Sequence, residues 1–419
     1  MDTGSKSYIE MLARRPLNVK ALWGKENVGL VSGRDIYAAC KELGCAVLAA
    51  NCRSPLTAKG VLRAAKKLNA AVVLEIAKSE TAYCYGTFEN LPTYAAKYSK
   101  ELGDGIIFAM HIDHYGIKSE GDVIKAVPHI PSLLAKGWTS VAIDASHLPD
   151  YENLCATRDV AMSIPAYLGL EVEVGEIKGA GELSTVEEAL FFIGGLNSWG
   201  VYPDLIAISN GSLHGTYDAS SGQQEGIDLN RTLEIAEAIA PYGTSIAQHG
   251  ISGTPLHKVE EFHKYRINKG NVATLFQNVA FGIRMDPDTG NADTSTGSYV
   301  KEEKRGVSDA LWQKIVSWAD GEKISRKGGD YKKANLPFGE AILNESPEVV
   351  ERIVAETEEW ATRFIKAMKS EGSADKVLEV MNRRLDYNSA PERKPMNPRS
   401  NYTQDKAPNK KKSEGNFDD

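Results

Sequence analysis

Short apolar runs alternate with longer amphipathic segments through most of the chain. The first two runs, 45–51 and 70–77, predict strands, and the segment between them, 57–68, has helical spacing with its basic residues turned outward. A third run starts at residue 105, stays apolar to residue 110 and continues into the motif HIDH at 111–114. Uninterrupted apolar runs bounded by turns are typical of parallel strands that are buried on both faces. The pattern therefore predicts buried parallel strands joined by helices.

The same alternation continues toward the C-terminus. Five further strands are predicted, at 140–145, 171–176, 204–209, 245–248 and 272–276. Helices are predicted at 122–135, 151–168 (ended by Gly169), 186–195, 230–240, 255–266 and 307–319. Eight strands alternating with helices over about 250 residues fit a closed (β/α)8 TIM barrel better than a doubly wound sheet. The predicted fold class is therefore α/β.

The C-terminal part of the chain has a different pattern. Residues 347–369 predict a long amphipathic helix with acid and base pairs at i,i+4, and 374–384 predict another. We expect their apolar faces to pack on the barrel or on a second subunit. Beyond residue 385 almost nothing can be buried, which predicts a disordered tail. We therefore divide the chain into a barrel at 1–345, a helical extension at 346–385 and a tail at 386–419.

Composition and charge narrow the class of partner. A net charge of -7 and a pI near 5.8 argue against nucleic acid or an anionic membrane as the main partner. Residues 1–15 lack the apolar core of a signal peptide, and no later segment is long and apolar enough to span a bilayer, so we expect a cytoplasmic protein. The five cysteines are an odd number without paired metal-type spacing, which predicts reduced thiols.

Ionisable residues follow five successive predicted strands. Since parallel strands of a barrel end at one rim, and unpaired buried charge costs several kcal/mol, we expect these side chains to share a site. Taken alone, any one of them is explained as a strand cap or as a hydrogen-bonded structural histidine. The residues, in strand order, are Asp113 and His114, Asp144 and His147, Glu173 and Glu176, His214, and His249.

Three histidines from separate strands, with carboxylates nearby, suit a divalent cation such as Zn2+ that keeps a coordination position open for substrate. Gly215 and Gly250 each follow one of these histidines, and a glycine lets the backbone approach a ligand closely. The loop 250–254 precedes a predicted helix near Pro255, so its amides and the Ser252 hydroxyl are candidates to hold a phosphate. An ordinary helix N-cap explains Ser252 nearly as well.

Five motifs occur in register between residues 51 and 255: HIDH, SVAIDASHLPDYEN, LEVEVGE, NGSLHGTYD and QHGISGTP. Together they resemble the class II, metal-dependent fructose-bisphosphate aldolase family. The resemblance implies a lyase that reversibly cleaves a ketose bisphosphate, first of all fructose 1,6-bisphosphate. The products would be dihydroxyacetone phosphate and glyceraldehyde 3-phosphate, formed through a metal-stabilised enediolate. It also implies a homo-oligomer, a dimer or tetramer.

The resemblance implies a metal centre at the end of the barrel. His114, His214 and His249 match the metal ligands, and Asp144 and Glu173 match carboxylates that hold the metal in an alternative position. The metal would be Zn2+ or another divalent cation such as Co2+, Fe2+ or Mn2+. A monovalent cation, Na+ or K+, is implied near the phosphate of the substrate.

The resemblance also implies the residues that handle protons and substrate. Asp113 matches the acid that protonates the aldehyde oxygen, and Glu182, in the loop after the fifth strand, is the best match for the base. The matches for substrate and phosphate binding are Asn51, Gly211, Gly215, Gly250, Ser252, Gly253 and Asn278. Asn278 is chosen as the counterpart of an asparagine that the family brings in with its eighth strand.

Strand alternation distinguishes the members of HIDH. His111 and Asp113 should share one face and His114 should take the other, unless the strand ends or twists at Asp113. We therefore assign His114 to the metal and Asp113 to proton transfer, and we expect His111 to support the site or to pack.

Other interpretations remain open at this stage. A tagatose-bisphosphate aldolase, or another ketose-phosphate aldolase on the same barrel, would keep the histidines and change the contacts to the acceptor. The family's arginine for the distal phosphate has no clear match, although Arg53, Lys332 or Lys333 would substitute. A non-catalytic subunit would be expected to lose ligands. A Schiff-base mechanism is disfavoured, because Lys78, the nearest strand-end lysine, would need a buried site to lower its pKa.

Overall fold

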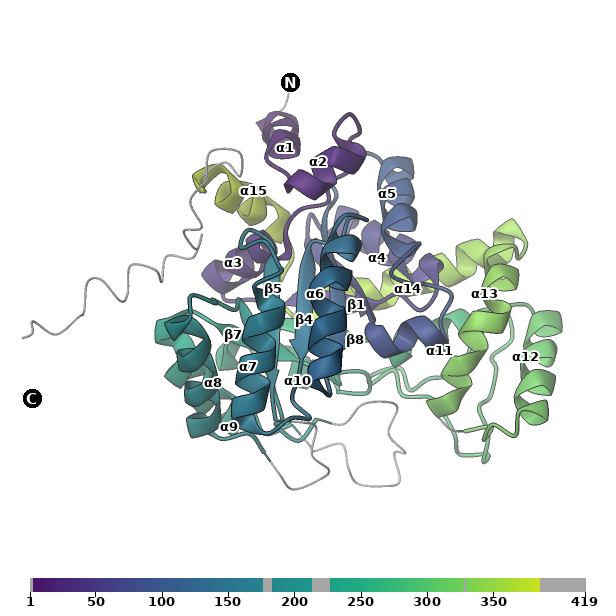
Figure 1. Cartoon of the computed structure of the whole chain (residues 1–419). Coiled ribbons are helices and arrows are strands. Elements are labelled where there is room, and N and C mark those ends of the chain that lie inside the picture. Colours follow the sequence, from purple (N-terminus) through teal and green to yellow (C-terminus); the bar gives the residue numbers. More distant parts are fainter. Residues whose placement is uncertain (1–2, 176–182, 213–226, 328, 385–419) are drawn as a thin grey trace, which may run out of the picture.

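The computed structural model describes residues 3–175, 183–212, 227–327 and 329–384. Eight parallel strands pair in chain order and close into a barrel, with helices outside it (Figure 1). This confirms the predicted (β/α)8 fold. The strands are β1 Val47–Asn51, β2 Ala71–Ala77, β3 Ile107–Gly116, β4 Ser140–Asp144, β5 Gly169–Val174, β6 Leu205–Ile208, β7 Ser245–Gln248 and β8 Ile267–Val272.

Helices follow the strands and carry the local features that start a helix. Before α8, the Thr185 hydroxyl accepts from the Glu188 amide at 3.1 Å, and the Glu188 carboxylate accepts from the Thr185 amide at 2.7 Å. The helices between strands are α4 Pro55–Lys67, α5 Leu91–Leu102, α6 Glu120–Leu134, α7 Asp150–Ala161, α8 Val186–Ser198, α9 Leu229–Ile239 and α10 Leu256–Val259. Those outside this repeat are α1 Thr3–Ala13, α2 Leu17–Trp23, α3 Gly33–Leu43, α11 Thr274–Phe281, α12 Asp309–Gly321, α13 Asn335–Leu343, α14 Pro347–Ala367 and α15 Ser373–Arg383.

Alternation along each strand produces two apolar layers. Outward-facing residues such as Leu48, Leu74 and Phe108 pack with the helices in one large buried cluster. Inward-facing residues such as Val47 and Val73 belong to a second cluster inside the barrel. The barrel is therefore filled by side chains and is a packed core.

Three of the predicted boundaries are wrong. The eighth strand is Ile267–Val272 and not 272–276, where the chain already enters α11. Its sequence INKGNV hides it, because the inward-facing side chains are polar. Helix α7 ends at Ala161, well before Gly169, which begins β5. The predicted helix 255–266 is broken into α10 and the 3-10 turn Phe262–Tyr265.

The two C-terminal helices pack on the same chain. Helix α14 lies along α4 so closely that a Cβ added at Gly60 would be 2.5 Å from the Thr357 Cβ. Its Trp360 and Phe364 join the buried cluster around the barrel, and α15 packs against α3. No helix in the described parts of the chain is long and apolar enough to cross a membrane. The predicted tail at 386–419 lies outside the described residues, and the division of the chain into domains stays a prediction.

Candidate metal centre and active site

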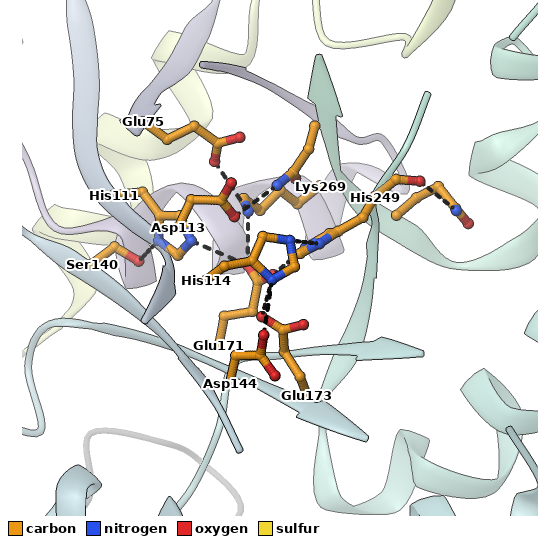
Figure 2. A network of polar contacts seen from close by, with 12 residues as sticks. Glu75, His111, Asp113, His114, Ser140, Asp144, Glu171, Glu173, His249 and Lys269 are labelled. Carbon is orange, nitrogen blue, oxygen red and sulfur yellow. Dashed lines mark hydrogen bonds and ion pairs between the residues drawn. The ribbon is translucent and has the colours of Figure 1, made fainter. Parts of the chain in front are cut away.

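Polar side chains fill the carboxyl half of the barrel interior. Each is buried and is brought inward by the alternation of its strand (Figure 2). The third strand supplies two of them, His111 and Asp113, as the predicted alternation requires. They include Asn51 on β1, Glu75 on β2, His111 and Asp113 on β3, Glu171 and Glu173 on β5, Asn271 on β8, and Lys269 on β8, whose side chain extends to Glu75 and Glu171.

His114 reaches the same site through a break in the strand. Its φ is +41°, a left-handed conformation that is uncommon for a residue with a side chain. The pairing of β3 with β4 also shifts register between Ile112 and Tyr115. The strand therefore bulges at His114. Alternation would place His114 on the outer face unless the strand twisted at Asp113, and the bulge instead places its imidazole among the other polar groups (Figure 2).

The imidazoles of His114 and His249 meet at the centre of the site. His114 Nε2 lies 2.8 Å from His249 Nδ1. On its other side, His114 Nδ1 lies 2.8 Å from the Glu173 carboxylate and 3.3 Å from that of Asp144. His249 Nε2 lies 2.7 Å from Glu171 Oε1. Each ring therefore has one nitrogen against a carboxylate and the other against its neighbour.

This arrangement fits a bound cation. A carboxylate only accepts hydrogen bonds, so in the neutral rings the protons sit on His114 Nδ1 and His249 Nε2. Two nitrogen lone pairs then face each other across 2.8 Å, and they repel unless a proton or a cation lies against them. Ligand atoms of Asp113, His114 and His249, and of His114, Asp144 and Glu173, also lie within 4.8 Å of one another. The described donors thus suit a divalent ion of borderline softness.

The charges of the site are strongly coupled. Burial opposes the charged form of His114, but Glu173 and Asp113 outweigh it and raise the imidazole pKa well above its ordinary value. Burial likewise opposes ionisation of Asp113, yet His114 and Lys269 lower its pKa to about 2. Burial and the nearby Asp144 raise the pKa of Glu173 to about 7. Positive charge at the centre of the site, from a protonated imidazole or a bound cation, therefore favours the ionised form of these carboxylates.

Two amides hold the Asp113 carboxylate from opposite sides. The Asn51 amide donates to Oδ2 and the Asn271 amide donates to Oδ1, each at 3.1 Å. Asn51 also donates to Glu80 at 2.9 Å. Asn271 therefore occupies the place at the eighth strand that the sequence analysis gave to Asn278. Asn278 lies buried on α11, so its placement at the end of that strand is wrong.

The loop after β7 carries the candidate phosphate residues. Gly250 and Gly253 have φ values of +68° and +91°, which favour glycine. A Cβ at Gly253 would also meet Asn291 Oδ1 at 2.3 Å. Ser252 Oγ accepts from the Ala273 amide at 3.1 Å, which ties the loop to the end of β8. The N-cap of α10 is Pro255, so the alternative role of Ser252 as a helix cap is not observed.

Of the remaining predicted residues, one lies within the described parts of the chain and three lie outside them. Gly211 lies just after β6 with a φ of +88°. His214, Gly215 and Glu182 lie outside the described residues, so their predicted roles stay predictions.

The basic residues considered for the acceptor phosphate have other partners. Arg53 is buried, with Nε 2.6 Å from the Glu80 carboxylate and Nη1 donating to Gln277 at 2.8 Å. Lys333 pairs with Asp330 at 3.1 Å. Lys332 lies over the ring of Tyr83, with Nζ 5.1 Å from its centre.

Sequence analysis missed the layer directly beneath the histidines. Lys269 lies between two carboxylates, with Nζ 2.8 Å from Glu171 Oε2 and 3.2 Å from Glu75 Oε2 (Figure 2). The acidic inward positions of β5 were visible in EVEVGE, but the lysine that neutralises them was not. Its strand was placed too late in the sequence, so Lys269 was never assigned to the interior.

Comparison with known proteins finds a matching family profile and several relatives. The sequence profile described as "Fructose-bisphosphate aldolase class-II" matches residues 31–320. The chain is 28% identical to a fructose-bisphosphate aldolase of Streptococcus pneumoniae over 262 residues, which cover 61% of this chain and 82% of that protein. It is 28% identical to that of Streptococcus pyogenes over 280 residues, or 65% and 88%.

Solved structures agree on the fold. The crystal structure of the YdjI aldolase from Escherichia coli K12 matches with a TM-score of 0.54 at 15% identity, covering 81% of this chain and 98% of that chain. The fructose-bisphosphate aldolase of Campylobacter jejuni matches with a TM-score of 0.53 at 18% identity, covering 83% and 97%.

Proposed function

Since the chain belongs to the class II fructose-bisphosphate aldolase family of metal-dependent lyases, we propose that it reversibly cleaves fructose 1,6-bisphosphate. The products are dihydroxyacetone phosphate and glyceraldehyde 3-phosphate. The observation that carries this proposal is the meeting of His114 Nε2 and His249 Nδ1, each ring held from behind by a carboxylate. We assign the metal to these two histidines and His214, with Zn2+ as the ion.

The donor set supports this choice of ion. Nitrogen ligands with nearby carboxylates suit Zn2+. Co2+, Fe2+ or Mn2+ are the alternative ions for the same set of ligands. When bound, the divalent ion polarises the substrate carbonyl and stabilises the negative charge that develops on its oxygen. Asp144 and Glu173, both against His114, are proposed to hold the ion in a second position.

Asp113 is proposed to transfer the proton at the aldehyde oxygen. Its carboxylate is fixed on both sides by the amides of Asn51 and Asn271, so it is positioned before substrate arrives. Glu182 is proposed as the base that removes a proton from dihydroxyacetone phosphate. The two carboxylates would then act at different ends of the bond that is formed or broken.

A Schiff-base mechanism is less consistent with the lysines of the site. Such a mechanism needs a neutral amine. Burial opposes the charge of Lys269, but Glu171 and Glu75 outweigh it and raise its pKa well above the ordinary value. Burial lowers the pKa of Lys78, but its Nζ donates to the Gly116 carbonyl at 2.9 Å and lies 4.1 Å from the centre of the Tyr115 ring.

The donor phosphate is proposed to bind the loop after β7. Gly250, Ser252 and Gly253 are proposed to donate backbone amides there, and Gly211, which follows β6, is proposed to contribute as well. Gly215 is proposed for the same role from the sequence alone. A monovalent cation, Na+ or K+, is proposed beside this phosphate. Asn278 is retained as a weaker candidate for substrate binding.

The acceptor is the less constrained half of the substrate. The charge of Arg53 is neutralised by Glu80 and that of Lys333 by Asp330. We therefore propose Lys332, which lies over the ring of Tyr83, for the distal phosphate. A tagatose-bisphosphate or other ketose-phosphate aldolase would use the same metal centre.

We also propose that the enzyme is a homo-oligomer, a dimer or tetramer. Light scattering on purified protein measures its mass in solution.

A cleavage screen tests the substrate. Purified protein is assayed against fructose 1,6-bisphosphate, tagatose 1,6-bisphosphate and the ketose monophosphates, with and without a chelator. We expect cleavage of fructose 1,6-bisphosphate that the chelator abolishes and Zn2+ restores. Cleavage of the other ketose phosphates with fructose 1,6-bisphosphate left intact would overturn the proposed acceptor.

A further inference from the structure

A chain of three buried residues runs from the middle of the barrel to the metal centre. Lys269 Nζ lies 2.8 Å from Glu171 Oε2, and the other oxygen of the same carboxylate lies 2.7 Å from His249 Nε2. Lys269 and Glu171 have no exposed surface, and 6% of the His249 side chain is exposed. Residues of two strands, Lys269 of β8 and Glu171 of β5, therefore fix the imidazole of His249, which follows β7 (Figure 2).

The contact with Glu171 decides which nitrogen of His249 faces the site. Because the carboxylate only accepts, Nε2 must carry the proton and donate. Nδ1 is left with its lone pair directed at His114 Nε2, 2.8 Å away. A ring without this partner could rotate, or could place its proton on Nδ1, and in either case would lose the ligand atom.

The carboxylate in turn needs its position fixed. Glu171 is fully buried, where an uncompensated negative charge is costly. Lys269 neutralises it, and the same ammonium lies 3.2 Å from Glu75 Oε2 on β2. His111 Nε2 lies 3.5 Å from Glu171 Oε2, while its Nδ1 is held 2.8 Å from the Ser140 hydroxyl. Glu171 is therefore fixed from two sides, with one oxygen left for His249.

We propose that Lys269 and Glu171 are positioning residues that orient His249 so that its Nδ1 is presented to the metal. This rests on the proposed function, in which His249 is a ligand. It goes further because it assigns a role to a buried ion pair that never touches the substrate. A histidine ligand whose second nitrogen is held by a carboxylate typically loses about 10–100-fold in metal affinity when that partner is removed.

The test is the Zn2+ affinity of the full-length protein, measured by competition with a chromophoric chelator. The decisive variant is the double change Glu171→Met and Lys269→Met. Replacing a buried ion pair with apolar side chains of similar size is often neutral or stabilising. Glu75 also loses the Lys269 ammonium, but burial raises the pKa of Glu75 well above its ordinary value, so this carboxyl can stay neutral and the protein should fold. We expect it to bind Zn2+ about 10–100-fold more weakly than wild type. In the Co2+-loaded protein, the visible absorption spectrum should change because the ligand geometry changes.

The single variant Lys269→Met tests the role of the ammonium itself. We expect weaker Zn2+ binding, because Glu171 loses the group that fixes its second oxygen. Wild-type affinity and an unchanged Co2+ spectrum in both variants would overturn the proposal and would make the ion pair purely structural.

A matched control is the partly buried ion pair between Asp35 on helix α3 and Arg384 at the end of α15, whose charged atoms are 2.7 Å apart. Asp35→Asn should lower stability and leave Zn2+ affinity unchanged. His249→Ala distinguishes failure of the proposed metal site from failure of the positioning role. If His249→Ala retains Zn2+ affinity, the proposed metal site fails. If it loses Zn2+ while both Lys269→Met and the double variant keep it, only the positioning role fails.

Discussion

The two halves of the barrel interior differ sharply although the same strands build both. In the amino half, the inward positions on β1 to β3 are apolar, and Ala49, Val73 and Ala109 lie side by side in register. Two residues further along these strands, Asn51, Glu75 and His111 lie side by side instead. One step of the strand repeat separates a packed apolar layer from a layer of ionisable groups.

The apolar half of the barrel interior contributes mainly to stability, and the polar half carries the groups proposed for catalysis. The apolar half needs no partner, since burial of hydrocarbon is favourable by itself. Each member of the polar half needs a specific neighbour, because an unpaired buried charge costs several kcal/mol. Lys269 pairs in register with Val47 and Ala247, at the apolar level, and its long side chain extends to Glu75 and Glu171. The Lys269 backbone therefore belongs to the apolar half, and its ammonium group pairs with carboxylates of the polar half.

The largest effect is expected from removing a ligand in the polar half. His114→Ala should abolish Zn2+ binding and fructose 1,6-bisphosphate cleavage, because two carboxylates and His249 lose the group between them. Metal content after dialysis and the cleavage rate measure this. A variant that keeps both metal and activity would show that the polar half is not the metal centre.

A large effect of another kind is expected from the apolar half. Ile107 is an inward residue of β3 with 1% of its surface exposed. Ile107→Ala should lower the free energy of unfolding by about 2–5 kcal/mol through lost burial and a cavity. Zn2+ affinity of the folded protein should stay at its wild-type value, as urea titrations with and without metal will show. A parallel loss of metal affinity would mean that the halves are not separable.

A smaller effect is expected where an amide positions Asp113. Asn271→Ala removes one of its two side-chain donors, and a hydrogen bond to a charged group is worth about 1.5–3 kcal/mol. We expect kcat/KM to fall about 10–100-fold, with Zn2+ affinity nearly unchanged. Steady-state kinetics on metal-saturated protein measure it. If metal affinity falls as much as kcat/KM, Asn271 acts on the metal centre and not on Asp113 alone.

The sequence allowed the barrel and much of its rim to be predicted. Apolar runs that end in polar residues, as at Asp113 and Asp144, mark a strand and its carboxyl end together. That pattern failed for β8, because Lys269 and Asn271 make the inward face of the strand polar. A polar strand is recognisable only once its partners are known, and those partners lie on strands far away in the sequence.

Local backbone geometry was the other part that the sequence did not reveal. The alternation left two possible faces for His114, and the left-handed conformation at that residue determines which one is used. Such a conformation is maintained by the surrounding contacts of β3, β4 and β5, so no local pattern encodes it. The role of Glu171 was hidden for the same reason, since His249 and Lys269 come from other strands.

The metal centre at His114 and His249 is tested most directly by a Zn2+ titration of protein that has been stripped with a chelator. The rate of fructose 1,6-bisphosphate cleavage is followed as metal is added. We expect no cleavage before addition, a linear rise, and a plateau near one equivalent of Zn2+ per chain, with His249→Ala remaining inactive throughout. Full activity in the stripped protein, or a plateau reached equally well by His249→Ala, would contradict it.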